Sequence, residues 1–177
     1  SQYFFGQQSN QLWKGYFSYN EIVDVESSTN AVFASTQNAL FSQVVASSNL
    51  NVYNSITGLK PDVITTIHHS DAFNKTFVGN NNGLILIQNA DGSVTTKVDV
   101  IEEVPVPPNK KKINDFFEFN GRLYIATDYG ISVIDIATSE FISTYFIGTS
   151  GEETEVLQTT VFNNEIYAVT RSFGIRK

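Results

Sequence analysis

A short sequence pattern recurs four times along this chain, at an almost constant spacing. Each copy has an apolar stretch, a polar turn, a small residue that ends the turn, and a new apolar stretch. The small residues are Ala39, Gly83, Gly130 and Gly174, which are 44, 47 and 44 residues apart. An all-β repeat of this length is typical of β-propeller blades, each a small sheet that must pack against its neighbours to form a core.

Apolar and polar residues alternate along most of the chain with little 3.6-residue periodicity, which predicts strands. The predicted strands are 21–26, 31–36, 40–46 and 50–55; 63–69, 75–79, 84–88 and 93–101; 113–119, 123–127, 131–136 and 141–147; and 156–162 and 166–170. The dipeptides Asp91-Gly92 and Asn120-Gly121 favour hairpins, because they tolerate the positive φ angles of a type I′ turn. We therefore predict an all-β fold, an incomplete β-propeller of four-stranded antiparallel blades. The blades are expected at about 20–60, 61–111, 112–154 and 155–177, after a lead-in at 1–19.

Three blades and part of a fourth are fewer than a typical closed propeller of ~4–8 blades contains. Either Leu12–Phe17 supplies a closing strand to a four-bladed ring, or the chain is a piece of a larger ring, and we favour the second. An open ring leaves sheet faces and strand edges without partners, so we expect the isolated chain to self-associate. The recurring glycines predict a backbone that resists a Cβ or a close approach to a neighbour. With Ala39 in that position, the first blade is expected to be the least regular.

The acidic composition excludes one class of function. The net charge of −7 and the pI near 4.7 argue against nucleic acid as a partner, because such proteins present basic surfaces. The chain has no cysteine, so it forms no disulfide or thiolate metal site. No apolar run approaches the ~18 residues that a membrane span needs. The start, Ser1–Gly6, lacks the features of a signal peptide, so we expect any export signal to have been removed.

No motif for catalysis, a cofactor or a metal is found, and the chain is predicted not to be an enzyme. His68 and His69 are adjacent on a predicted strand and point to opposite faces, so they cannot chelate one ion together. We expect one of them to pack in the blade and the other to face solvent. The connector 102–112, with Pro105, Pro107 and Pro108, is predicted to be a surface loop, and its three lysines, 110–112, to be solvated.

The loops between the second and third strands of each blade open on the same face of a propeller as the connectors between blades. These loops carry amide, carboxylate, guanidinium and aromatic side chains, which suit a sugar or a protein surface. Turn formation and packing explain the same residue types equally well. The candidate rim for a ligand or partner consists of Asn80, Asn81, Asn82, Asp128, Tyr129, Arg171 and Phe173.

Several short motifs, taken in order and spacing, resemble one propeller family. They are Trp13, Ser18–Ile22, Gly58-Leu59 before Val63–Ile67, Gly79 with Asn82-Gly83, Lys112–Asn114, Leu123–Ile136, Thr144-Tyr145 with Gly148 and Gly151, and Ile166–Thr170. Across residues 12–177 the chain is similar to the N-terminal β-propeller of the PorZ family. These are surface components of the type IX secretion system of Bacteroidetes and belong to the wider two-component-regulator-type propellers.

The resemblance implies a non-enzymatic module of a cell-surface complex that processes secreted cargo and attaches it to lipopolysaccharide. It implies other secretion-complex proteins as partners, with lipopolysaccharide or another glycan as a further one, and an exported, outer-membrane-associated location. The alternative is a periplasmic propeller of a hybrid two-component regulator that binds an oligosaccharide. A propeller lyase or hydrolase is a third hypothesis, and it would need a pocket of converging carboxylate, histidine or tyrosine groups.

Overall fold

In the computed structural model, residues 21–47, 49–60, 62–103 and 106–177 are described, and they form four antiparallel sheets. The predicted lead-in at 1–19 and the closing strand at Leu12–Phe17 lie outside the described residues. The first sheet contains β1 (Asp24–Ser27), β2 (Ala31–Ser35), β3 (Leu40–Val44) and β4 (Leu50–Tyr53). The second contains β5 (Ile64–Ser70), β6 (Lys75–Asn80), β7 (Ile85–Gln88) and β8 (Val94–Lys97). The third contains β9 (Ile113–Phe119), β10 (Arg122–Thr127), β11 (Ile131–Asp135) and β12 (Phe141–Tyr145), and the fourth β13 (Val156–Phe162), β14 (Glu165–Thr170) and β15 (Gly174–Arg176).

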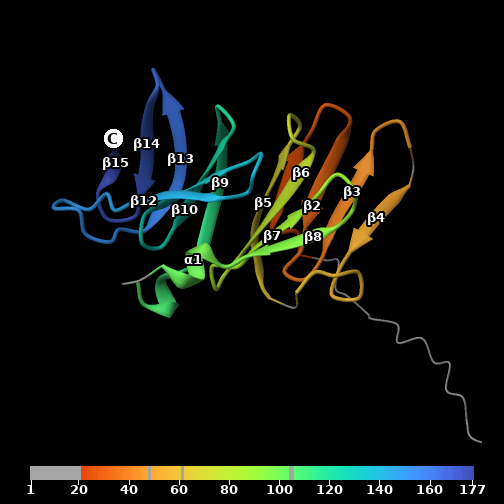
Figure 1. The fold of residues 1–177 in the computed structure, drawn as a ribbon, viewed down its shortest axis with the longest axis horizontal. Coiled ribbons are helices and arrows are strands. Elements are labelled where there is room, and N and C mark those ends of the chain that lie inside the picture. Colours follow the sequence, from red (N-terminus) through yellow and green to blue (C-terminus); the bar gives the residue numbers. More distant parts are fainter. Residues whose placement is uncertain (1–20, 48, 61, 104–105) are drawn as a thin grey trace, which may run out of the picture.

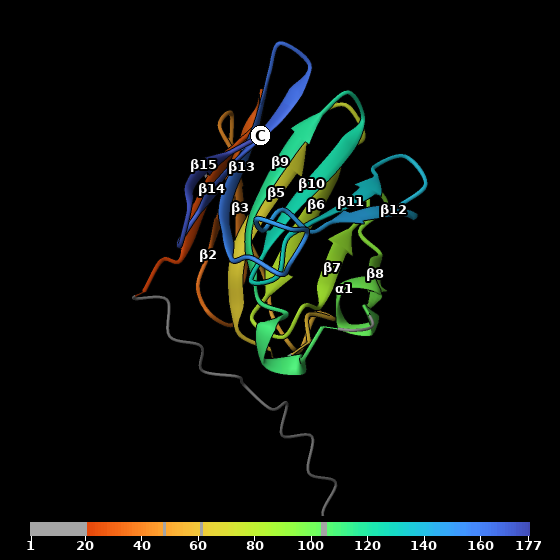
Figure 2. The ribbon, with the colours of Figure 1, turned by 90° about the vertical axis from the view of Figure 1, so that its left-hand side faces the viewer.

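The four sheets stand side by side in chain order, and each is a simple meander (Figures 1 and 2). The first strands of neighbouring sheets lie next to each other, β1 beside β5, β5 beside β9 and β9 beside β13. They are the inner strands, on the side where the sheets converge. This arrangement confirms the predicted all-β fold, an incomplete β-propeller of antiparallel blades. The strand β15, which the sequence pattern did not predict, gives the fourth sheet three strands.

Three apolar cores lie between the sheets, one at each junction. The first contains Phe33 and Leu40 of the first sheet with Ile67, Val78 and other residues of the second. The second joins the second and third sheets, and the third joins the third and fourth. Each blade therefore buries an apolar face against the next, as a structure built from small sheets requires.

The inner strands are also linked by side chains at β-bulges. The register of β5 with β6 shifts between Ile64 and Thr66, and Thr65 within this bulge donates a 2.6 Å hydrogen bond to the carbonyl of Ile113 in β9. In the next blade, Asn114 occupies the corresponding place in β9 and donates a 2.9 Å bond to the carbonyl of Val156 in β13. A bulge releases one residue from its own ladder, so its side chain can reach a neighbouring strand.

The connector between the second and third sheets differs from its predicted form. The predicted strand 93–101 ends at Lys97, and the chain then forms the short helix α1 (Asp99–Glu102) and the 3₁₀ turn η1 (Pro108–Lys110). The side chains of Val100 and Val106 are buried in the core between these sheets, so the connector is not simply a surface loop. Lys111, predicted to be solvated, is buried and donates hydrogen bonds to the carbonyls of Ile101 and Glu103. Its ammonium group satisfies carbonyls at the end of α1 that have no partner within the helix.

The expectation that the first blade is the least regular is wrong. Its strand pairings run without a register shift, whereas the described sheets that follow it each contain at least one. The turn before β3 is closed by a 2.9 Å hydrogen bond from the amide of Thr36 to the carbonyl of Ala39. In the third sheet, the amide of Thr127 makes the equivalent bond to the carbonyl of Gly130. The turn therefore tolerates alanine in the first sheet.

Lys75 joins the second and third sheets from outside the apolar core. Its Nζ donates to the carbonyls of Ile136 and Ala137 at 2.7 and 2.8 Å and to the Oγ of Ser139 at 3.0 Å. We expect Lys75→Met to lower the free energy of unfolding by about 1.5 kcal/mol, because charge-assisted bonds are lost and the side chain is only half-buried. Urea denaturation measures this loss. The control Lys60→Met, at an exposed position, should change stability by less than about 0.5 kcal/mol, and an equal loss in both variants would contradict a link between the sheets.

Candidate functional site

The loops between second and third strands lie beside the segment that precedes the first strand of their own sheet. Backbone hydrogen bonds fix this arrangement in three sheets: the amide of Asn81 to the carbonyl of Val63, of Asp128 to Lys112, and of Arg171 to Glu155. The bonds are 3.0, 3.2 and 3.2 Å long. We call this edge of the molecule, with the loops 80–83, 128–130 and 171–173 and the segments before each first strand, the connector face. Its accessible side chains are the candidate site.

Two of the predicted rim residues are buried, and the prediction that they face a ligand is wrong. The Asn80 side chain has no exposed surface, and its amide donates a 3.0 Å bond to the carbonyl of Leu84, which stabilises its own turn. Tyr129 is also fully buried, in the core between the second and third sheets, and its hydroxyl lies 2.7 Å from the Oγ of Ser132. Burial raises the pKa of Tyr129 to about 12. Asn80 ends β6 and Tyr129 lies in the loop after β10, and both side chains point into the molecule.

Charged side chains gather on the connector face at the third and fourth sheets. The Nε of Arg171 donates a 2.6 Å hydrogen bond to the Oε2 of Glu155, and the same guanidinium interacts electrostatically with Asp128. The hydrogen bond to Arg171 holds the pKa of Glu155 below its ordinary value, and the charge of Lys112 acts in the same direction. Asp128 in turn accepts a 2.8 Å hydrogen bond from the amide of Asn114. The sequence reasoning missed the partner role of Glu155 and Asn114, because each comes from another segment of the chain.

The remaining rim residues are exposed. Phe173 carries the guanidinium of Arg176 over its ring, 4.6 Å from the ring centroid. Asn82 uses its Oδ1 to accept a 3.0 Å bond from the amide of Leu84, and Asn81 lies exposed beside it. The connector face thus presents paired charges, an aromatic ring and amides. Such groups can form hydrogen bonds and stacking contacts with a protein or glycan surface.

Both histidines pack between blades, contrary to the expectation that one faces solvent. His68 lies between Glu26 and Glu118, while His69 stacks on Phe33 with ring centroids 4.3 Å apart. The Nδ1 of His69 is 2.9 Å from the hydroxyl of Thr76. Within residues 21–47, 49–60, 62–103 and 106–177, no group of three or more histidine, cysteine, aspartate or glutamate side chains is arranged to hold a metal ion.

Two inner-strand aspartates have structural partners. The Oδ2 of Asp24 accepts hydrogen bonds from the amide of Ile67 at 2.8 Å and the hydroxyl of Thr66 at 2.9 Å, which joins the first and second sheets. Burial raises the pKa of Asp115 to about 6, although backbone amides, including that of Thr159 in the fourth sheet, donate hydrogen bonds to it. Both carboxyl groups therefore link neighbouring sheets.

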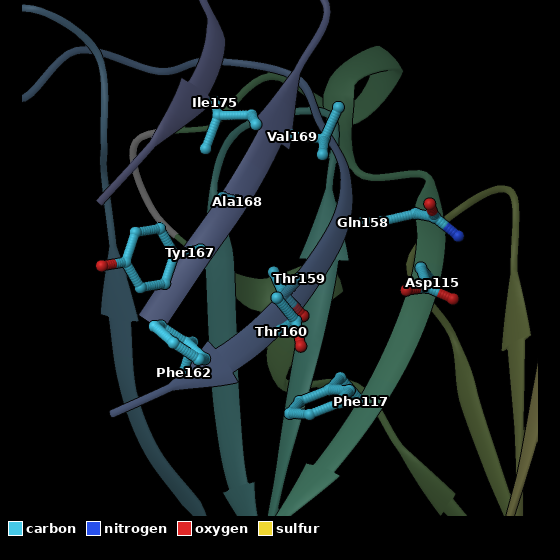
Figure 3. A pocket seen from close by; sticks show the side chains of 10 residues that line it. All are labelled: Asp115, Phe117, Gln158, Thr159, Thr160, Phe162, Tyr167, Ala168, Val169 and Ile175. Atoms are coloured by element: carbon cyan, nitrogen blue, oxygen red, sulfur yellow. The ribbon is translucent and has the colours of Figure 1, made fainter. Parts of the chain in front are cut away.

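An apolar hollow of about 550 Å³ lies on the face of the fourth sheet that the third sheet does not cover (Figure 3). Phe162, Tyr167, Val169 and Ile175 line it on the side of the fourth sheet, and Phe117 lies at its border. Phe162 is 64% exposed and Ile175 is 74% exposed. The open ring predicted from the sequence leaves a sheet face uncovered, but this hollow was not predicted, because it is lined by residues of two sheets.

The comparison with known families decides the classification. The family model of the N-terminal β-propeller domain of PorZ, described as a TSS9 component, matches residues 32–177. This chain belongs to the PorZ N-terminal β-propeller family. The resemblance that the sequence motifs indicated is thereby confirmed. No curated protein matches the chain.

Solved structures show the same fold as this PorZ-family propeller. PorZ of Porphyromonas gingivalis, an essential surface component of the type IX secretion system, superposes with a TM-score of 0.71 at 20% identity, over 84% of this chain and 19% of PorZ. The extracellular domain of a putative hybrid two-component system from B. thetaiotaomicron has a TM-score of 0.65 at 18% identity, over 88% and 20% of the two chains. Streptogramin B lyase has a TM-score of 0.64 at 13% identity, over 88% and 53%. The chain thus spans about a fifth of the length of PorZ and of the two-component protein.

In the part of the chain that the structure describes, no helix is long and apolar enough to cross a bilayer.

Proposed function

We propose that this PorZ-family propeller is a non-catalytic interaction module of a cell-surface type IX secretion and cargo-attachment complex. The observation that carries the proposal is the family match over residues 32–177. The connector face supports it, because exposed charges and an aromatic ring there have no role in the three cores between the sheets. The partners are other proteins of the secretion complex, with lipopolysaccharide or another glycan as a further ligand, and the domain acts outside the outer membrane.

The inner-strand carboxylates support a non-catalytic role. Hydrolysis of a glycosidic bond needs two carboxyl groups free to act on the substrate. Asp24 and Asp115 instead accept hydrogen bonds from the backbone of a neighbouring sheet. These bonds give both carboxyl groups a structural role, because they join neighbouring sheets.

The test is the delivery of cargo to the cell surface by the full-length protein. Deletion of the gene in the source bacterium should leave cargo unattached, and the wild-type gene should restore attachment. We expect the triple variant Asp128→Ala, Arg171→Ala, Phe173→Ala to restore less than about a tenth of the surface cargo, since a few charged and aromatic contacts dominate interfaces. The isolated domain should keep its melting temperature within a few degrees.

A matched control lies at the opposite end of the third sheet. Arg122, Glu140 and Phe141 are exposed or nearly so and carry the same three kinds of side chain. Their triple alanine variant should restore cargo attachment fully. Full restoration by both triple variants would overturn the connector face as the interaction surface, and normal cargo attachment after deletion would overturn the secretion role.

The second candidate is the ligand-sensing propeller of a hybrid two-component regulator, favoured by the similar extracellular domains from B. thetaiotaomicron. A sensor would bind an oligosaccharide, and its deletion would abolish the transcriptional response to that sugar. Cargo would still be attached normally. Measuring both responses in one deletion strain therefore separates the two functions.

A further inference from the structure

His68 contacts acidic side chains of two other sheets. It lies on β5, with its Nδ1 3.5 Å from the Oε1 of Glu26 on β1 and its Nε2 3.0 Å from the Oε2 of Glu118 on β9. The three strands are inner strands of successive blades, and β5 lies between the other two. The His68 side chain is 14% exposed, and those of Glu26 and Glu118 are 32% and 22% exposed. One imidazole therefore bridges the first and third blades.

We infer that Glu26, His68 and Glu118 form a pH-sensitive clamp, which ties three blades together when the imidazole is protonated. Ionised carboxylates only accept hydrogen bonds, and the imidazolium ion donates from both ring nitrogens. Neutral imidazole has one N–H, so it can serve one glutamate while its lone pair faces the other. Loss of the proton therefore opens one of the two contacts between blades.

The other ionisable groups around His68 are already engaged. Asp24 on β1 accepts hydrogen bonds from Thr66 and Ile67. Asp115 on β9 accepts hydrogen bonds from backbone amides of its own blade and of the next blade. Lys75 on β6 is directed to the carbonyls of the third sheet. β2 carries no ionisable side chain, and the adjacent His69 interacts with Asp71. The imidazole is therefore the ionisable group that lies between the two glutamates.

The electrostatics agree with this geometry. Burial, the largest single influence, lowers the pKa of His68, but the hydrogen bonds and charges of Glu26 and Glu118 together raise it above 6.5. Because the pKa is higher in the folded state, the contribution of the clamp is fully present below pH 6.5. It is lost as the pH rises through the pKa of the folded state.

Two neighbouring groups add their own pH dependence. The raised pKa of Asp115, about 6, stabilises the fold most below about pH 4, the ordinary value, and this contribution is lost as the pH rises through about 6. Burial lowers the pKa of His69, so protonation of His69 in the unfolded chain costs stability as the pH falls below 6.5. The contribution of the clamp to stability must therefore be measured by comparing variants, because the pH dependence of the wild type combines all three groups.

The direct experiment is an NMR titration of the two histidine rings in the whole 177-residue chain. The chain has two histidines, so a His69→Gln variant assigns both signals. His68 is expected to titrate above 6.5, and the double variant Glu26→Gln, Glu118→Gln should move its pKa below 6.5. A wild-type His68 that titrates at or below 6.5, or a pKa unchanged in the double variant, would overturn the clamp.

Thermal unfolding between pH 6 and 8.5 tests whether the proton links the blades. His68→Gln should remove the part of the fall in melting temperature that occurs above pH 6.5, while His69→Gln should leave that part unchanged. The same fall in wild type and His68→Gln would contradict the proposal. If His68→Gln does not fold, the single variant Glu118→Gln must show a smaller fall above pH 6.5 than the wild type, and an unchanged profile there counts against the clamp.

Discussion

Replacing Phe77 with alanine should lower the free energy of unfolding by about 3–5 kcal/mol, the range for removing a buried phenylalanine ring. Phe77 is fully buried in the core between the second and third sheets. Its ring lies 6.4 Å from that of Phe116, centroid to centroid, on the facing blade. The cavity would lie where two sheets depend on each other, and neither can close it alone. Urea denaturation followed by circular dichroism measures the loss.

The matched control is Phe162→Ala. Phe162 belongs to the fourth sheet but projects from its uncovered face, where it is 64% exposed and contacts Tyr167 edge-on. Its removal should cost less than about 1 kcal/mol, because little apolar surface returns to water. Equal losses in the two variants would mean that stability does not come from packing between blades, and the propeller interpretation would lose its physical basis.

The architecture was predictable because a repeat reports the same structural constraint several times. A single turn at Gly130 is weak evidence, but related turns at 44–47-residue intervals require equivalent sheets. The alternation of apolar and polar residues predicted most strands, but it was misleading in the connector between the second and third sheets. The stretch Val98–Ile101 alternates well enough to be predicted as part of a strand, yet Asp99–Glu102 forms α1, and Val100 is buried against the neighbouring sheet. Tertiary packing outweighed the local pattern there.

The candidate site was less predictable, because exposure depends on the direction of each side chain at a loop. Tyr129 and Asp128 are adjacent, yet one fills a core and the other lies on the connector face. The alternation of apolar and polar residues along the chain does not predict contacts between distant segments. Nothing in the sequence pairs Glu118 with His68, since the strand register and the order of blades bring them together. The contacts of Asn114 could not be predicted either, because they depend on its position in a β-bulge.

A glycine substitution provides the second large effect. Gly83 has a φ of +89°, and a Cβ placed there would lie 2.9 Å from the carbonyl oxygen of Lys111 and from a methyl group of Val100. Gly83→Ala should lower the free energy of unfolding by about 1–2 kcal/mol for the backbone conformation, and by about 1–3 kcal/mol more for the clash. The obstruction cannot move easily, because Lys111 is buried and bonded to the carbonyls of Ile101 and Glu103.

Gly92 separates the two contributions. It has a similar φ of +82°, but an added Cβ would meet nothing within 4 Å. Gly92→Ala should therefore show the conformational loss alone, about 1–2 kcal/mol. The difference between the variants, measured by urea denaturation, reports how closely the connector is held against the turn of the second sheet. No difference would mean that the connector yields to the methyl group, and that the buried Lys111 and Val100 do not fix its position against the blade.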